Sequence, residues 1–244
     1  MTIISVHLPK TAGTSFGVSL AMHFGDRLKY DNGDQAICKS PVERWQQTIA
    51  AGLAMAEQDL EKIECVHGHF LPAKYLPLGQ NRALTFVTWM REPVARMFSH
   101  YHYWRHSYDE ATAAPHHRQM IEEDWSLERF CFSGEFRNIY TQYLWRFPIE
   151  KFSFVGICEY FQQELDEFSS RYLSTKLPHQ HHNATPRTAS IAELDEGFLK
   201  AVRDFHAADV ALYAKALRLR RIRLDMAKDR MRFGTGAELR HAVG

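Results

Sequence analysis

The chain opens with a β-branched run that passes directly into a short loop of small residues. Residues 2–8 read Thr-Ile-Ile-Ser-Val-His-Leu, a composition typical of a buried strand. Pro9 ends this run, and the loop that follows leads into residues 13–22, whose apolar side chains suit a helix. A strand, a tight loop and a helix in this order are typical of an α/β fold, which constrains the rest of the chain strongly.

The remainder of the chain repeats this alternation of strands and helices. Further strands are predicted at residues 64–67, 83–90 and 152–157, and helices at 42–63, 93–104, 126–147, 161–173 and 191–219. We therefore predict an α/β, three-layer fold with a central, mainly parallel sheet flanked by helices. In such sheets ligands bind beyond the carboxyl ends of the strands.

Composition excludes several classes of protein. The 244 residues carry a formal net charge of +1, less basic than a general nucleic-acid binder, and show no repeat or linker that would divide a single domain at 1–244. The four cysteines form no CxxC pair, which suits a reducing compartment. We find no signal peptide and no apolar run long enough to span a bilayer, and so predict a cytoplasmic protein without an integral membrane segment.

The loop after the first predicted strand carries the chemistry of an anion site. Lys10 and the hydroxyls of Thr14 and Ser15 stand beside a helix N-terminus, whose N–H groups and dipole favour a phosphate. In a Walker A loop the lysine follows the second glycine, whereas Lys10 precedes Gly13, and no acidic magnesium ligand is evident. The loop therefore favours a metal-free anion site, the alternative being an ordinary capped turn between strand and helix.

A second anion site is predicted where the strand at 83–90 ends. Arg91 and Ser99 are eight residues apart, at the start of a helix and two turns along it. A planar guanidinium binds phosphate through two hydrogen bonds, so the pair could hold one phosphate. The alternative for Arg91 is an ion pair with a nearby carboxylate such as that of Glu92, and Arg96 is predicted to be structural.

Two imidazoles follow the strand at 64–67, those of His67 and His69. Imidazole has a pKa near neutrality and is a common general base. A metal pair is the alternative, with further ligands from His179, His181 or His182.

Together these stretches resemble a known enzyme family. Residues 7–16, His-Leu-Pro-Lys-Thr-Ala-Gly-Thr-Ser-Phe, resemble the 5′-phosphosulfate loop of carbohydrate sulfotransferases that use 3′-phosphoadenosine 5′-phosphosulfate (PAPS), in particular the branch of heparan sulfate 2-O-sulfotransferase and its bacterial relatives. The stretch from Arg91 to Ser99 is similar to the family's 3′-phosphate motif, and residues 66–70 to its His-Gly-His element. The order of the motifs also agrees with that of the family.

The resemblance implies a P-loop-like sulfotransferase that moves a sulfuryl group from PAPS to a hydroxyl acceptor by in-line transfer, leaving adenosine 3′,5′-bisphosphate. His67 would be the general base, His69 would bind the acceptor, and Lys10 would stabilise the departing phosphate oxygen. The donor would be held, without a metal, by Lys10, Thr11, Ala12, Gly13, Thr14, Ser15, Arg91, Ser99 and Arg187. A carbohydrate or glycosylated metabolite is the acceptor that the resemblance favours.

Two segments are predicted to surround this core. Residues 102–147 are rich in aromatic and basic residues and could form an acceptor-side helical insertion, although an aromatic helical core is the alternative. Residues 215–244 form a basic C-terminal tail, interpreted as a solvated helix, and an oligomer is compatible with the sequence.

Two other functions fit parts of this pattern. One is a P-loop nucleotide kinase or related phosphotransferase, which would need ATP and magnesium. The other is a non-catalytic module that binds anions or glycans, against which the intact Lys10 and His67 argue.

Overall fold

The first strand lies in the middle of the central sheet. The computed structural model describes residues 1–34, 39–56, 61–80, 82–173, 175–177 and 194–233. Its five strands have the order β2-β3-β1-β4-β5, and every neighbouring pair is parallel. Their bounds are Thr2–Val6 (β1), Leu28–Tyr30 (β2), Cys65–Gly68 (β3), Leu84–Met90 (β4) and Phe154–Ile157 (β5). The predicted α/β sheet is thereby confirmed.

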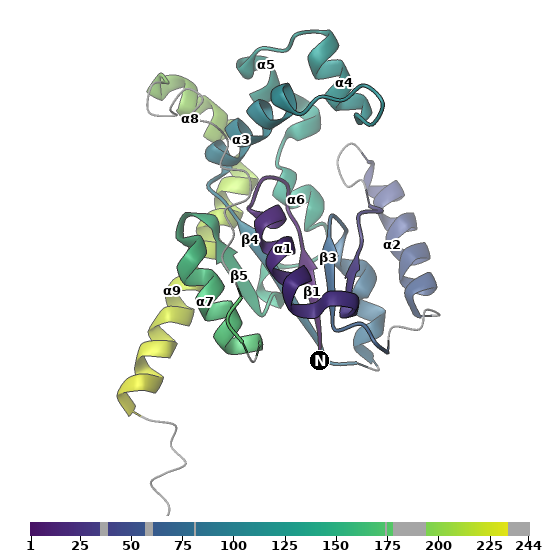
Figure 1. Cartoon of the computed structure of the whole chain (residues 1–244). Helices are drawn as coiled ribbons and strands as arrows, with labels where there is room; N and C mark the ends of the chain where they lie inside the picture. Colours follow the sequence, from purple (N-terminus) through teal and green to yellow (C-terminus); the bar gives the residue numbers. More distant parts are fainter. Residues whose placement is uncertain (35–38, 57–60, 81, 174, 178–193, 234–244) are drawn as a thin grey trace, which may run out of the picture.

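Helices cover both faces of this sheet, so the fold has three layers (Figure 1). The successive β1 residues Ile3 and Ile4 point to opposite faces and belong to different apolar clusters. The cluster around Ile3 is covered by α1 (Gly13–Phe24) and α7 (Phe161–Tyr172). The cluster around Ile4 is covered by α3 (Pro93–His106), α6 (Ile139–Tyr143), α8 (Glu196–Phe205) and α9 (Ala207–Phe233).

The segment 102–147 forms a helical lobe beyond the carboxyl ends of the strands (Figure 1). It contains the end of α3, α4 (Pro115–Glu122), α5 (Leu127–Cys131) and α6. Its aromatic residues Trp125, Phe130 and Phe136 are buried among one another and the sheet-side cluster. These three aromatic side chains therefore belong to a core, and only other residues of the lobe are placed to meet a ligand.

Several elements differ from those that the sequence predicts. β2 and α4 were not anticipated; β2 has only three residues and is partly exposed, so it carries no continuous apolar signal. β1 ends at Val6 rather than at residue 8, and α2 runs over Pro41–Ala56 instead of reaching residue 63. Short 3-10 turns complete the chain at Gly25–Arg27, Pro72–Gln80, Gly134–Phe136, Ile149–Lys151 and Cys158–Tyr160.

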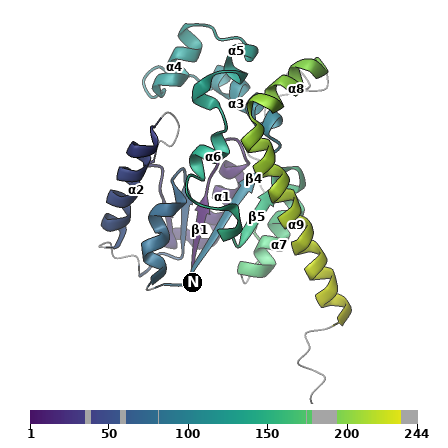
Figure 2. The same ribbon diagram turned by 180° about the vertical axis from the view of Figure 1, so that it is seen from behind.

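Residues 215–233 of the basic segment are part of the long helix α9, which crosses the sheet and projects past it (Figures 1 and 2). Its inner part is not simply solvated, because the buried Glu164 of α7 accepts hydrogen bonds from both Arg220 and Arg223. Arg223 also pairs with Glu167 at 3.0 Å. Although α9 has 27 residues, none of the helices in the described residues is long and apolar enough to cross a membrane.

Loss of the Glu164 carboxylate is predicted to destabilise the fold. Glu164 is only 1% exposed, so Glu164→Ala removes the buried carboxylate that pairs with Arg220 and Arg223 and leaves Arg223 with Glu167 alone, at a cost of about 3 kcal/mol in the free energy of unfolding. Urea unfolding followed by circular dichroism measures this. Asp204→Ala, which removes the exposed pair with Lys200, serves as the control and should leave the midpoint unchanged. Equal midpoints for both variants would contradict the assignment.

Candidate functional site

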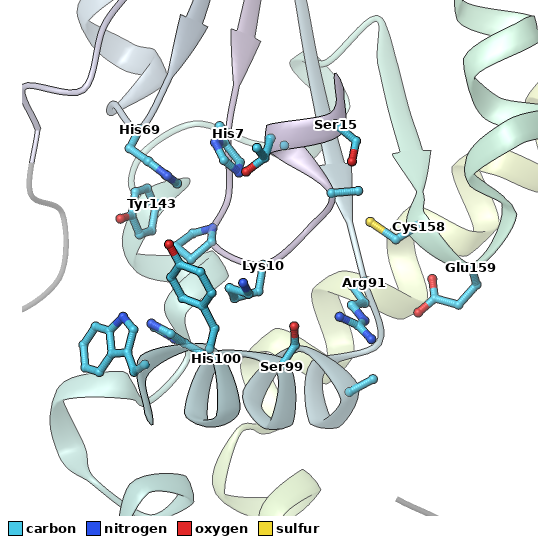
Figure 3. A pocket seen from close by; sticks show the side chains of 17 residues that line it. His7, Lys10, Ser15, His69, Arg91, Ser99, His100, Tyr143, Cys158 and Glu159 are labelled. Carbon is cyan, nitrogen blue, oxygen red and sulfur yellow. The ribbon is translucent and has the colours of Figure 1, made fainter. Parts of the chain in front are cut away.

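An open cavity of about 720 Å³ lies at the carboxyl edge of the sheet. Residues that follow β1, β3, β4 and β5 meet there, and α3 and α6 close one side (Figure 3). We call Lys10, Thr14, Ser15, Arg91 and Ser99 the phosphate-binding half of its lining, since these are the cationic and hydroxyl side chains. The aromatic half consists of His7, His69, His100, Tyr103, Trp104 and Tyr143.

The loop between β1 and α1 has an unusual backbone. Lys10 and Ala12 have φ angles of 64° and 59°, the left-handed region that costs a non-glycine residue about 1 kcal/mol or more. Between them the buried Thr11 donates from its hydroxyl to the carbonyl oxygen of Leu8 at 2.8 Å, which stabilises the turn. No side chain caps α1 at Ala12, so a bound anion can accept hydrogen bonds from the first turn instead.

Gly13 is required where α1 begins because the helix starts directly against an imidazole. A Cβ atom at this position would lie 1.8 Å from Cδ2 of His7, far inside van der Waals contact. The absence of a side chain therefore lets the helix N-terminus lie beside His7 at the edge of the cavity.

Lys10 lies in the middle of the cavity (Figure 3). Its ammonium group lies over the ring of Tyr103, 3.5 Å from the ring centroid. Burial, and then the nearby charge of Arg91, lower the pKa of Lys10 to about 8. Among the described residues no carboxylate forms an ion pair with Lys10 or Arg91. The two cations therefore lack a protein counter-ion in this part of the chain, as expected for a site that binds an anionic ligand.

One ridge of α3 continues the phosphate-binding half. Arg91 precedes the helix, and Ala95, Ser99 and Tyr103 follow at intervals of four residues, all lining the cavity. Glu92 caps α3 by accepting a hydrogen bond from the N–H of Ala95 at 2.7 Å, so the cap does not occupy the guanidinium of Arg91. Arg91 and Ser99 thus line the same cavity, and that they hold one phosphate stays a prediction.

The backbone of Arg91 is held in place by the hydroxyl of Tyr140. The buried Tyr140 hydroxyl accepts a hydrogen bond from the N–H of Arg91 at 3.0 Å and donates one to its carbonyl oxygen at 2.6 Å. Arg96 is fully buried on the other side of α3, beside the Tyr140 ring, and does not line the cavity. This buried position agrees with the prediction that Arg96 is structural.

His67 lies under the loop and does not line the cavity. Its Nε2 is 3.2 Å from the carbonyl oxygen of Gly13, which can only accept, so Nε2 carries the hydrogen. Its Nδ1, 2.8 Å from Oγ of Ser5, then accepts a hydrogen bond from that hydroxyl. Burial lowers the pKa of His67 to about 4. The ring is thus neutral with both nitrogens engaged, an arrangement that supports the loop and leaves no nitrogen for an acceptor.

Three other imidazoles line the cavity, those of His7, His69 and His100. His7 stacks on His69, with ring centroids 4.0 Å apart. The pKa of each is lowered, first of all by burial, so all three rings are neutral near pH 7. The Nδ1 atoms of His69 and His100 are buried and have no hydrogen-bond partner among the described residues.

Most of the predicted site residues therefore come together. Lys10, Ala12, Gly13, Thr14, Ser15, His69, Arg91 and Ser99 line the cavity, whereas Thr11 and His67 lie beneath it, and Arg187 lies outside the described residues. The sequence analysis missed His7, His100, Tyr103 and Tyr143. The four-residue spacing from Ser99 would have identified Tyr103, but no local signal marks His100 or Tyr143.

A metal site finds no support in the described part of the chain. No group of three His, Cys, Asp or Glu residues there is arranged to hold a metal ion. The carboxylate of Glu159, at the cavity rim, accepts hydrogen bonds from the N–H of Glu92 and the hydroxyl of Tyr213. His179, His181 and His182, considered above as further ligands, lie outside the described residues.

Solved structures that resemble the chain include two sulfotransferases. The chain is similar to a sulfotransferase from Alicyclobacillus acidocaldarius, with a TM-score of 0.45 and 17% identity over 88% of this chain and 95% of that one. It is also similar to mouse sulfotransferase SULT7A1 complexed with PAP, with a TM-score of 0.39 and 8% identity over 83% of this chain and 63% of that one. No protein-family model and no curated protein sequence matches the chain. The function is therefore derived from the residues of the cavity.

A methyl group at Gly13 is predicted to disturb the cavity. In Gly13→Ala the new Cβ clashes with His7, so we expect a loss of about 2 kcal/mol, or about 6 °C in Tm. Gly134→Ala is the matched control, because nothing lies within 4 Å of its Cβ, and its Tm should stay near that of the unaltered protein. Differential scanning calorimetry compares the two, and equal Tm values would show that the approach of His7 is not tight.

Proposed function

We propose that the protein is a sulfotransferase that transfers the sulfuryl group of PAPS to a hydroxyl acceptor. The observation that supports it is the pair of cations in one cavity, Lys10 after β1 and Arg91 after β4, neither in an ion pair with a described carboxylate. β1 and β4 are neighbours in the sheet, so the two anion sites are side by side but separate. A nucleotide with anionic groups at both its 5′ and 3′ positions fits this pairing.

The donor would lie across the carboxyl edge of the sheet. Its 5′-phosphosulfate would be held by Lys10, the first turn of α1 and the hydroxyls of Thr14 and Ser15. Its 3′-phosphate would be held by Arg91 and Ser99. Arg187, which lies outside the described residues, remains part of the proposal as a residue that would bind the donor.

In the proposed reaction the acceptor oxygen attacks sulfur as it loses its proton to a base. A bond forms between that oxygen and sulfur, and the bond between sulfur and the bridging phosphate oxygen breaks. Adenosine 3′,5′-bisphosphate leaves, and Lys10 stabilises the charge that develops on its departing oxygen.

We assign the base to His69 rather than to His67, which the sequence resemblance favoured. His69 lines the cavity and its Nδ1 has no partner among the described residues, whereas both nitrogens of His67 are engaged. Because the pKa of His69 is lowered by burial, its ring is neutral and able to accept a proton at pH 7. A carbohydrate acceptor, which the resemblance favours, would lie against the aromatic half.

Arg91 is predicted to dominate the affinity for adenosine 3′,5′-bisphosphate. Arg91→Ala removes charge-assisted hydrogen bonds worth about 2–3 kcal/mol, so calorimetry in EDTA should show affinity about 50-fold weaker. Arg105→Ala is the control, since Arg105 lies on the same helix, is exposed and pairs with Asp124. Absence of binding by the unaltered protein, or preference for ATP with magnesium, would overturn the proposal.

The pH dependence of kcat/KM is predicted to be bell-shaped. The acid limb should lie below pH 6.5, because the pKa of His69 is lowered and its ring takes up a proton only at more acidic pH. The alkaline limb should lie near pH 8, where Lys10 loses its proton. In Lys10→Arg the alkaline limb should move to higher pH, since a guanidinium stays charged; a limb that remains near pH 8 would contradict the role of Lys10.

The same assay separates the two histidines that were considered for the base. His69→Ala should lower kcat by about 100-fold or more with the affinity for the bisphosphate retained. His67→Ala removes the support of Gly13 and should weaken bisphosphate binding together with stability. A His69→Ala enzyme with normal kcat would refute the assignment of the base.

A further inference from the structure

The aromatic half of the cavity carries no charged side chain among the described residues. The aromatic rings in this half are those of Tyr103, Trp104 and Tyr143, and the polar groups are the imidazoles of His7, His69 and His100. All three imidazoles are neutral near pH 7 because burial lowers the pKa of each. Aromatic faces stack on the apolar face of a ring, and neutral imidazoles exchange hydrogen bonds with hydroxyls.

His100 is a buried residue of this half whose ring nitrogen Nδ1 has no hydrogen-bond partner among the described residues. It is only 4% exposed, and its ring packs edge-on against Trp104 and Phe130 at centroid distances of 4.5 and 5.4 Å. Its Nδ1 is buried without a partner, and a buried polar atom left unpaired costs about 1–3 kcal/mol. His69 has a second unpartnered Nδ1 in the same lining. Two unpaired nitrogens in one lining suit a ligand with more than one hydroxyl.

The charge balance of the cavity disfavours an anionic acceptor. The 3′-phosphate and the phosphosulfate of the proposed donor together carry about four negative charges near neutral pH. Lys10 and Arg91 supply two positive charges, Glu159 adds a negative one, and no other lysine or arginine in the described part of the chain lines the cavity. With the donor bound, the site is net negative, so a carboxylated or sulfated acceptor would be repelled in a partly buried space.

From these observations we infer that the acceptor is an uncharged sugar ring, stacked on the aromatic half, with one hydroxyl at His69 and a second at Nδ1 of His100. This inference rests on the proposed function and makes His100 a specificity-determining residue. It also separates this chain from enzymes whose acceptor is an anionic polysaccharide, because the cation that contacts the aromatic half, Lys10 over the ring of Tyr103, is the one that the proposed donor engages.

Binding to the product complex tests the inference without requiring turnover. The protein is saturated with adenosine 3′,5′-bisphosphate, and 4-nitrophenyl glycosides of glucose and galactose are titrated by calorimetry beside the matching glucuronide and galacturonide. At least one neutral glycoside should bind, and its uronide counterpart should bind at least about 10-fold more weakly. 4-Nitrophenol serves as the third arm and should bind more weakly than the glycoside, since it has a single hydroxyl.

The variant His100→Phe keeps the packing of the ring and removes Nδ1. It should bind the neutral glycoside about 10-fold more weakly, the loss of roughly one hydrogen bond, with unchanged affinity for the bisphosphate. His102→Phe is the matched control on the same helix, outside the cavity lining, and should behave like the unaltered protein.

The outcomes separate the inference from the function on which it rests. If the bisphosphate does not bind, the proposed function fails. If it binds but no glycoside does, or uronides or the phenol bind equally well or better, the acceptor class is wrong while the donor site stands. Normal glycoside affinity in His100→Phe would refute the role of His100.

Discussion

The repulsion between the positive charges of Lys10 and Arg91 is the constraint on which the site depends. The two cations follow neighbouring strands, meet in one cavity, and pair with no carboxylate among the described residues. Burial, and after it the charge of Arg91, lowers the pKa of Lys10. A rigid parallel sheet holds the charges together, and an anionic ligand that spans both relieves the repulsion. The free protein thus has a site already formed for a ligand with two anionic groups.

The loop that carries Lys10 is held by histidines that have no direct part in the proposed chemistry of transfer. His67 lies beneath it and donates a hydrogen bond to the carbonyl oxygen of Gly13, while His7 lies so close to Gly13 that no Cβ could fit. The hydroxyl of Thr11 adds a third restraint from inside the turn. These contacts offset the strain of two left-handed residues, so the loop keeps one shape for the phosphosulfate. Imidazoles of the same sequence neighbourhood therefore serve different purposes, and burial and hydrogen bonding distinguish them.

Helix α3 connects the two halves of the cavity. Arg91 and Ser99 lie at its phosphate-binding end, and Tyr103 and Trp104, further along, belong to the aromatic half. Tyr140 fixes the start of this helix through the backbone of Arg91, and Tyr143, on the same short helix as Tyr140, lines the aromatic half. In the proposed reaction, this single helix would set the distance between the donor and the acceptor, which in-line transfer requires.

The sequence alone determined the α/β class and the places of Lys10, Gly13, Arg91 and Ser99 at strand ends and helix starts, because each depends on local order along one strand end or helix. Only the tertiary structure decided which imidazole faces the cavity. His67 and His69 are two residues apart, and the sequence does not show that Ser5 and Gly13 engage the first ring and leave a nitrogen of the second unpaired. His100 and Tyr143 were equally beyond prediction, since they reach the cavity through the packing of the helical lobe and lie far along the chain from the loop. Contacts within one element follow from residue spacing, whereas contacts between elements depend on how the chain packs.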